Sequence, residues 1–187
     1  GVQTLYAPVA NSTSVAETAM LLMLECSRNV IELRKIWVQD YYKAKLKTRK
    51  TTVNGKTVGI IGCGNIGSRL AVRALGMEMN VLAYDPYKKA DEFPEGVEVV
   101  RDLDRIFKES DYVSLHVPNT PITRGMVNKE RLEMMKPTAF LINTARGGCV
   151  VEQDLYEACK NKTIAGAGLD AIQKEPVDPA NPLLTLD

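Results

Sequence analysis

Three glycines, Gly62, Gly64 and Gly67, stand between an apolar run and a helical pattern in the stretch TVGIIGCGNIGSRLAVRAL. The first permits a tight turn, the second lets a ligand approach the backbone, and the third lets a helix pack closely on a strand. The amides around Asn65 and Ile66 then face outward at the start of a helix, where phosphate groups bind. This spacing predicts a site for the pyrophosphate of a dinucleotide.

Asp85 ends the next apolar run and bears on the identity of that dinucleotide. A carboxylate at this place accepts hydrogen bonds from both ribose hydroxyls and repels a 2′-phosphate, which favours NAD over NADP. Lys88 and Lys89 weaken the preference without reversing it. The glycines alone leave two alternatives open, namely a turn that binds no ligand, with Asp85 as a surface charge, and a site for FAD.

Arg146, in the stretch FLINTARGG, follows a fifth apolar run and is the next residue suited to chemistry. A planar guanidinium binds a carboxylate through two parallel hydrogen bonds, which a lysine cannot do. Glu175 follows the sixth run, and we expect both side chains at the same edge of the predicted sheet. The alternative for Arg146 is a structural salt bridge.

Alternating strand and helix patterns must position these residues. The residues predict strands at 58–61, 81–84, 97–100, 112–115, 139–143 and 164–169, and helices at 66–75, 103–109, 129–135 and 152–160. Such alternation is typical of a parallel sheet with right-handed crossovers and helices on both faces. Ligands bind to such a sheet beyond the carboxyl ends of its strands, where the strand order reverses. We therefore predict an α/β domain with a doubly wound sheet.

The segment before the first strand is predicted to be an irregular lead-in, residues 1–13, followed by one long helix over 14–37. Ser14 and Glu17 have the spacing of a capping box. Apolar residues recur from there at helical period. So many Met and Leu side chains on one helix indicate either core or a contact between subunits.

Composition excludes several other classes of protein. The 187 residues are 45% apolar and 25% charged, with a net charge of +1, as in a single soluble globular domain. The basic run KAKLKTRK, residues 43–50, is interpreted as a solvated loop, with nucleic-acid binding as the alternative. No signal peptide is recognisable, and the apolar run 19–24 is too short to span a bilayer. We expect neither a nucleic-acid nor a membrane partner.

The cysteine and histidine content points to the cytoplasm and away from metal chemistry. Cys26, Cys63, Cys149 and Cys159 have no CxxC spacing, so we predict four free thiols in a reducing compartment. Cys63 lies in the glycine turn, where a helix N-terminus lowers a thiol pKa, yet we interpret it as a small filler. His116 is the one histidine, which excludes a zinc site of several imidazoles.

Four ordered motifs resemble the D-isomer-specific 2-hydroxyacid dehydrogenases: GIIGCGNIGSRLA, SLHVPNTPITRGMVN, FLINTARGG and GAGLDAIQKEP. The earlier stretch ANSTSVAE is similar to that family's entry into its cofactor domain, so the resemblance covers essentially the whole chain. It implies a Rossmann-type doubly wound fold that binds NAD. It also implies hydride transfer between NAD(H) and a small D-2-hydroxy acid or the corresponding 2-keto acid.

The resemblance also implies roles for individual residues. Arg146 is expected to bind the substrate carboxylate and take part in catalysis. Glu175 is expected to pair with the catalytic histidine and raise its pKa, and Asp170 to meet the nicotinamide carboxamide. The remaining expected cofactor contacts are Val117, Pro118, Thr123, Thr144 and Ala145. These roles suit the reaction, which needs a cation for the carboxylate, a base for the hydroxyl proton and a nicotinamide to take the hydride.

The expected base is missing from the sequence. In the family, the catalytic histidine follows the glutamate by a few tens of residues, in a PH motif. His116 lies instead in LHVP, a motif that the family carries in addition to that histidine. We therefore interpret residues 1–187 as the dinucleotide-binding domain, with the N-terminal part and the C-terminal return of the catalytic domain outside this chain. We predict that it binds NAD(H) without turnover.

The resemblance implies a homodimer, because the family buries the helix expected at 14–37 between subunits. An alternative function is an NAD(H)-sensing dimeric interaction protein, like the C-terminal-binding-protein corepressors. These share the fold and keep the residues that correspond to Arg146 and Glu175.

Overall fold

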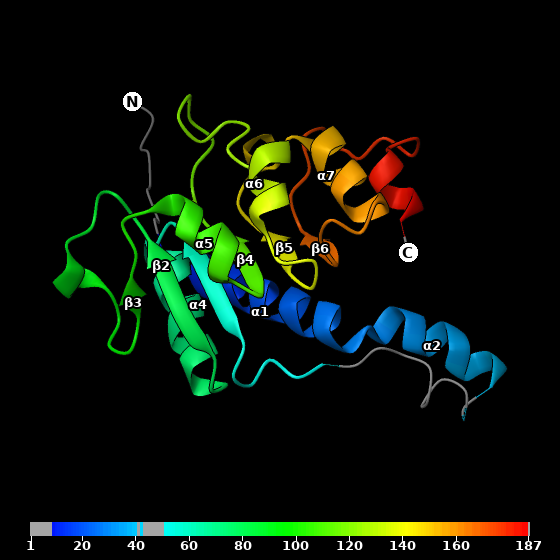
Figure 1. The fold of residues 1–187 in the computed structure, drawn as a ribbon, viewed down its shortest axis with the longest axis horizontal. Helices are drawn as coiled ribbons and strands as arrows, with labels where there is room; N and C mark the ends of the chain where they lie inside the picture. The colour runs from blue at the N-terminus through cyan, green and yellow to red at the C-terminus, as the bar shows by residue number, and fades with distance from the viewer. Residues whose placement is uncertain (1–8, 41, 43–50, 187) are drawn as a thin grey trace, which may run out of the picture.

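The computed structural model describes residues 9–40, 42 and 51–186. Residues 1–8 of the predicted lead-in and the whole basic run 43–50 lie outside the described residues. One parallel sheet of six strands forms the centre of the molecule (Figure 1). Its strands are β1 Thr57–Ile61, β2 Asn80–Tyr84, β3 Glu98–Val99, β4 Tyr112–Leu115, β5 Phe140–Asn143 and β6 Gly166–Leu169.

The strand order is β3-β2-β1-β4-β5-β6, so the chain winds outward in both directions from β1 and β4. This is the order of the Rossmann fold, and it confirms the predicted class. Strand β1 pairs in register with β2 on one side and with β4 on the other, for example Ile61 with Tyr84 and with Leu115. The switch point therefore lies at the carboxyl ends of β1 and β4.

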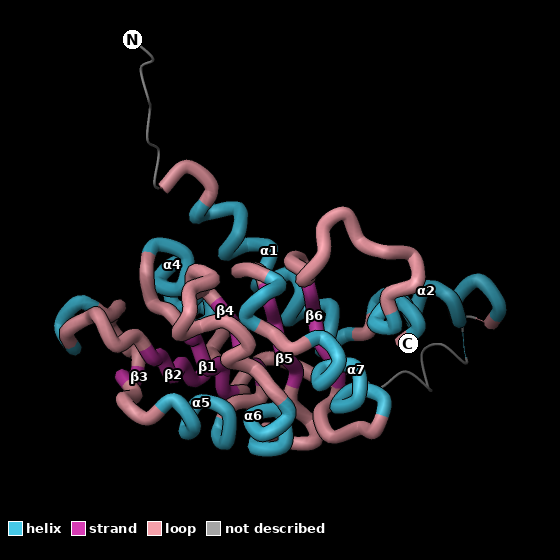
Figure 2. The backbone as a smooth tube through the Cα atoms, turned by 90° about the horizontal axis from the view of Figure 1, so that it is seen from above, coloured by secondary structure: helices cyan, strands magenta, loops and turns pink. Residues whose placement is uncertain are grey.

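Helices cover both faces of the sheet (Figure 2). Helices α1 and α4 lie on one face, and α5, α6 and α7 lie on the other. The α-helices that the structure describes in full are α1 Ser12–Arg28, α2 Val30–Gln39, α4 Asn65–Gly76, α5 Leu103–Glu109, α6 Lys129–Met134 and α7 Glu152–Lys160. Helix α2 projects away from the sheet, and none of its residues is buried (Figure 1).

Two apolar cores separate the sheet from its helices. Met23 of α1 and Leu70 of α4 pack on one face of the sheet with Ile60. Phe107 of α5 and Leu155 of α7 belong to the core on the opposite face. Successive side chains of a strand point to opposite faces, and the central strands are buried on both, which is why they read as unbroken apolar runs.

The single helix predicted over 14–37 is wrong, because the chain breaks it at Asn29. This residue has a left-handed backbone, with φ 49° and ψ 52°, and its N–H donates to the carbonyl of Glu25 at 2.7 Å. Asparagine tolerates this conformation better than other non-glycine residues. The Glu25 carboxylate accepts from the N–H of Ile31 at 2.9 Å and so satisfies an amide at the start of α2.

The predicted capping box is also wrong. Helix α1 starts at Ser12, which places Ser14 inside the first turn, and no side chain caps the helix. The Ser14 hydroxyl instead donates to the carbonyl of Asn11 at 2.9 Å. Glu17 pairs with Arg73 of α4 at 3.2 Å, because that face of α1 lies against α4.

Three strands are shorter than the sequence indicates, β5 by its first residue alone. Strand β3 has only two residues and pairs with β2 alone, at one edge of the sheet. Strand β6 begins at Gly166 rather than at residue 164. Thr163 and Ile164 donate to the carbonyl of Ala158, so they close the end of α7 before the strand begins.

Candidate functional site

The glycine turn lies at the switch point, between the end of β1 and the start of α4. Gly62 has φ +89°, and a Cβ added there would lie 2.6 Å from the carbonyl oxygen of His116 at the end of β4. A Cβ added at Gly67 would lie 2.1 Å from the carbonyl oxygen of Gly62. The turn and the first turn of α4 are therefore packed too closely for any side chain at these two positions.

The outward side of the same turn is open. A Cβ at Gly64 would meet no atom within 4 Å, and both Gly64 and Asn65 are exposed. Gly64 is the N-cap of α4, and no side chain there satisfies the first amides of the helix. Amides of this kind, with the positive end of the helix dipole behind them, form an anion site.

Asp85 is fixed beside the turn by two backbone hydrogen bonds. Its Oδ2 accepts from the N–H of Cys63 at 3.0 Å, and its Oδ1 accepts from the N–H of Tyr87 at 3.0 Å. Because a carboxylate oxygen can accept more than one hydrogen bond, both oxygens keep capacity for ribose hydroxyls. An open pocket of about 520 Å³ lies here. Its lining residues are Gly64, Asn65, Ser68, Arg69, Asp85, Tyr87 and Lys88.

Cys63 is a buried part of this turn rather than a reactive thiol. Its side chain is fully buried, and burial raises its pKa, although a hydrogen bond with Ser68 and the charge of Lys88 act in the opposite direction. The N-terminus of α4 therefore does not produce a thiolate here. All four cysteines are free, as the sequence predicts.

Arg146 follows β5 at the same edge of the sheet. Its side chain is exposed, and its Nη1 donates to the carbonyl of Ala145 at 2.7 Å. Within the described part of the chain no carboxylate forms an ion pair with Arg146, so the alternative of a structural salt bridge finds no partner. The guanidinium is available to an external carboxylate.

Asn143, the last residue of β5, organises the loops around Arg146, and the sequence reasoning missed it. Its buried amide accepts from the N–H of Ala145 at 3.1 Å and donates to the carbonyls of Arg146 at 3.1 Å and Ala171 at 3.4 Å. Its own carbonyl accepts from the N–H of Asp170 at 2.9 Å. One side chain therefore ties the loop after β5 to the loop after β6.

Gly147 brings these two loops into direct contact. A Cβ added there would lie 1.9 Å from the carbonyl carbon of Ile172. The doubled glycine after Arg146 was the signal that could have predicted this contact. Asp170 and Glu175 follow β6 on the same side, and both are exposed. The structure thus gathers these segments at one edge, while no hydrogen bond or ion pair joins Arg146 to Glu175.

The other predicted cofactor residues lie around the same edge. Val117 packs under the glycine turn, because its Cγ1 would be 2.8 Å from a Cβ on Gly62. Pro118 is exposed, and the Thr123 hydroxyl is used within its own loop, where it accepts from the N–H of Thr120 at 2.8 Å. Thr144 is buried, and its Oγ1 has no partner among the described residues.

His116 does not have the properties of a general base. Its Nε2 lies 2.9 Å from the Ser114 hydroxyl, and its buried Nδ1 has no hydrogen-bond partner among the described residues. Burial lowers its pKa from 6.5 to about 4, so the ring is neutral at pH 7. A base that accepts and returns a proton near neutral pH needs a pKa close to the working pH.

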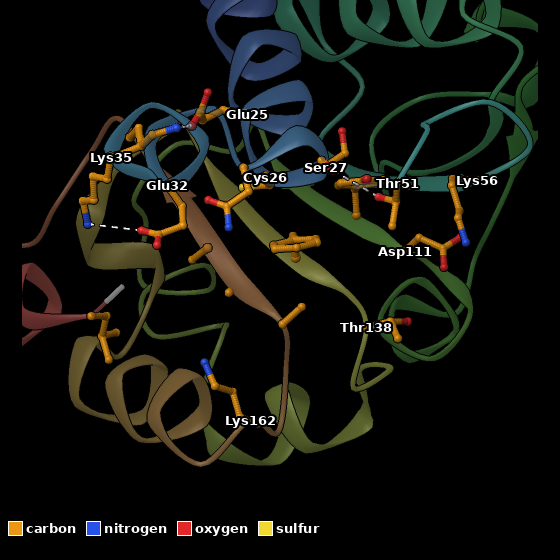
Figure 3. Close-up of a pocket in the computed structure, with 18 residues that line it drawn as sticks. Glu25, Cys26, Ser27, Glu32, Lys35, Thr51, Lys56, Asp111, Thr138 and Lys162 are labelled. Atoms are coloured by element: carbon orange, nitrogen blue, oxygen red, sulfur yellow. Dashed lines mark hydrogen bonds and ion pairs between the residues drawn. The ribbon is translucent and has the colours of Figure 1, made fainter. Parts of the chain in front are cut away.

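A second pocket, of about 490 Å³, lies at the opposite end of the sheet (Figure 3). Lys56, Asp111 and Ala165 in its lining immediately precede strands β1, β4 and β6, so it opens at the amino ends of the strands. It contains none of the predicted site residues. Because ligands of a doubly wound sheet bind at the carboxyl ends, this pocket is not the dinucleotide site.

Comparison with known proteins identifies the family. Residues 20–187 match the family described as D-isomer specific 2-hydroxyacid dehydrogenase, NAD binding domain. The chain belongs to this family. The structure of D-lactate dehydrogenase from Aquifex aeolicus, solved with NAD and lactic acid, matches with a TM-score of 0.78 and 37% identity. That match covers 90% of this chain and 50% of the solved chain.

Curated 2-hydroxyacid dehydrogenases are similar in sequence. The chain is 44% identical over 176 residues to hydroxypyruvate reductase of Thermotoga maritima, covering 94% of this chain and 56% of the relative. It is 41% identical over 189 residues to D-3-phosphoglycerate dehydrogenase of Methanocaldococcus jannaschii, covering 100% of this chain and 36% of the relative. The chain therefore spans about half or less of these relatives. The comparisons give no support to the corepressor alternative.

Proposed function

We propose that this NAD-binding domain serves an oxidoreductase that transfers a hydride between NAD(H) and a small D-2-hydroxy acid or 2-keto acid. One observation carries the proposal. The glycine turn, Asp85 and the unpaired guanidinium of Arg146 all lie at the carboxyl edge of the sheet. A dinucleotide on this edge would place its pyrophosphate at α4 and a bound acid beside Arg146.

The residues of the chain have distinct tasks in this proposal. Bound NAD supplies the hydride acceptor. The Asp85 carboxylate accepts hydrogen bonds from the ribose hydroxyls, and the backbone amides at the open Gly64 turn donate to the phosphates. Arg146 binds the acid through two parallel hydrogen bonds and fixes its orientation. Asp170 holds the carboxamide, and Glu175 faces an imidazole that keeps its proton near neutral pH.

Lack of a suitable base limits what the chain does alone. His116 is its one histidine, and the low pKa of this ring makes it unsuitable for proton transfer at pH 7. We therefore propose that catalysis needs an imidazole from outside these 187 residues. The chain should bind NAD(H) without sustained turnover of keto acids.

Titration with NADH tests the proposal. We expect enhanced NADH fluorescence on binding and weaker binding of NADPH. In an Asp85→Asn variant, which keeps a hydrogen-bond acceptor but loses the charge, the preference for NADH over NADPH should shrink. Absence of NADH binding would refute the proposal, and steady NADH oxidation with pyruvate, glyoxylate or hydroxypyruvate would refute the requirement for an outside base.

We also propose that the protein is a homodimer that contacts its partner through α2. Val30, Ile31 and Val38 of this helix are 49%, 64% and 84% exposed, so a helix without buried residues leaves three apolar side chains uncovered. Leu21 of α1 adds a further exposed apolar residue.

The location of the protein is a separate proposal, and the unpaired thiols support a reducing, cytoplasmic one. Among the described residues, no helix has the length and apolarity to cross a membrane.

A further inference from the structure

Lys88, three residues after Asp85, contacts the glycine turn through its ammonium. Its Nζ donates to the carbonyl of Cys63 at 2.9 Å and lies 3.5 Å from the Ser68 hydroxyl. Ser68 itself donates to the same carbonyl at 2.9 Å. The ammonium also lies 5.3 Å from the centre of the Phe93 ring, which attracts a cation. This half-buried lysine therefore has a defined position rather than a solvated one.

Asp85 and Lys88 bind both backbone groups of Cys63, one residue of the turn. The Asp85 carboxylate accepts from the N–H of Cys63, and the Lys88 ammonium donates to its carbonyl. Arg101 supports the segment that carries both charges, since its Nη1 donates to the carbonyls of Asp85 at 3.2 Å and Lys88 at 3.1 Å. Hydrogen bonds with a charged partner are stronger than neutral ones.

Cys63 directly precedes Gly64, whose outward face is open to a phosphate. Rotation of the Cys63 backbone would redirect the amides that follow it at the start of α4. A turn held at both backbone groups loses less conformational entropy when a ligand binds, which increases affinity. The position of the Lys88 ammonium also bears on selectivity, because the hydrogen bond to the Cys63 carbonyl uses one of its three donors and holds the ammonium at the turn.

We propose that Lys88 is a positioning residue for the dinucleotide, which holds the glycine turn in its binding conformation through the Cys63 carbonyl. This proposal rests on the proposed NAD(H) site. It differs from a role as a pocket cation, in which Lys88 would attract cofactor phosphates directly. The two roles predict different effects on NADH and NADPH.

Lys88→Met tests the proposal, because methionine keeps most of the stem but removes the ammonium. The matched control is Lys89→Met, which removes the same charge from the neighbouring exposed residue. We expect Lys88→Met to raise the Kd for NADH about tenfold, as for one lost charged hydrogen bond, and Lys89→Met to change it less than about twofold. The Kd for NADPH should rise by the same factor as that for NADH.

Further measurements separate positioning of the turn from direct attraction of phosphates and from a loss of folding. Lys88→Arg, which keeps a cationic donor, should restore most of the affinity, and thermal unfolding should report a folded protein for all variants. Unchanged NADH affinity in Lys88→Met, an equal loss in Lys89→Met, or a larger loss for NADPH than for NADH would each overturn the proposal. If the wild-type chain bound no NADH, both the proposed function and the positioning role of Lys88 would be refuted. Normal wild-type binding with an unaffected Lys88→Met would overturn the positioning role alone.

Discussion

At Gly67 the distance between helix and strand leaves no room for a methyl group, whereas at Gly64 a methyl group would enter open space. The two positions therefore separate packing from ligand binding within a single turn. A third glycine, Gly76 at the end of α4, also has open space around it but lies away from the site. These differences make glycine-to-alanine substitutions informative.

Gly67→Ala should lower the free energy of unfolding by about 3 kcal/mol, because the methyl group would overlap the Gly62 carbonyl oxygen. Gly64→Ala should keep the wild-type stability within about 0.5 kcal/mol and yet weaken NADH binding at least about tenfold. Urea denaturation and NADH titration measure the two effects. Gly76→Ala is the control, and it should change neither property adversely. Tight NADH binding by Gly64→Ala would contradict the proposed approach of the phosphates.

His116 should make stability depend on pH. Its pKa is about 4 in the folded protein and about 6.5 when unfolded, so the unfolded chain binds more protons between these values. The stabilisation is complete above about pH 6.5 and is lost as the pH falls to about 4, by up to about 3 kcal/mol. Denaturation curves of wild type and His116→Gln between about pH 7.5 and 4 should therefore converge towards acid pH. Parallel curves would show that the folded imidazole titrates normally.

Individual residues differ in how far sequence could assign them. The glycines and Asp85 could be placed because local spacing around one turn determines their arrangement. Asn143 and Lys88 could not, since each acts on backbone groups of a loop that is distant in sequence and close only after the strands pair. The doubled glycine after Arg146 was a weak sequence signal for such a contact between loops, because Gly147 has no room for a side chain beside Ile172.

At the level of elements, the break between α1 and α2 determines where α2 points. Apolar periodicity continues across Asn29, so the pattern of side chains alone predicts one helix. The left-handed backbone at Asn29 and the hydrogen bond from Ile31 to Glu25 end the first helix and begin the second. Similarly, strand propensity cannot show that Ile164 follows the end of α7 rather than starting β6. Its position depends on a hydrogen bond from its N–H to the carbonyl of Ala158.

Substitutions at Asn29 should test this break. Asn29→Gly should be tolerated, since glycine adopts the left-handed conformation freely, whereas Asn29→Val should lower the free energy of unfolding by about 1–2 kcal/mol. Chemical denaturation provides the comparison. Equal stability of the glycine and valine variants would mean that the backbone at Asn29 is not left-handed in solution.

The molecule as a whole was the most predictable level. Alternating runs and short connections allow few topologies, and the doubly wound sheet is the one that buries every central strand. Its strand order then gathers the ends of β1, β2, β5 and β6 at one edge, together with the residues that follow them. Assembly was harder to predict. Exposed apolar side chains on a helix indicate a contact surface, but they do not indicate the geometry of the contact.

Dimerisation through α2 should be sensitive to charge on its exposed face. The double variant Ile31→Glu with Val38→Glu should be a monomer of about 20.6 kDa by light scattering, while wild type should have twice that mass. Val72→Glu on α4, where the valine is 58% exposed, is the matched control and should remain dimeric. A wild-type monomer at micromolar concentration, or a dimeric double variant, would refute the proposed contact.

The hydrogen bond between Asp85 and the N–H of Cys63 has a consequence for redesign of coenzyme preference. In the proposed site, the carboxylate that would select the ribose also holds the loop that would receive the phosphates. Exchanging it for a small neutral side chain to admit a phosphorylated sugar would remove an anchor as well as a charge. Reprogramming the coenzyme therefore calls for paired substitutions, in which a second side chain restores an acceptor for that amide.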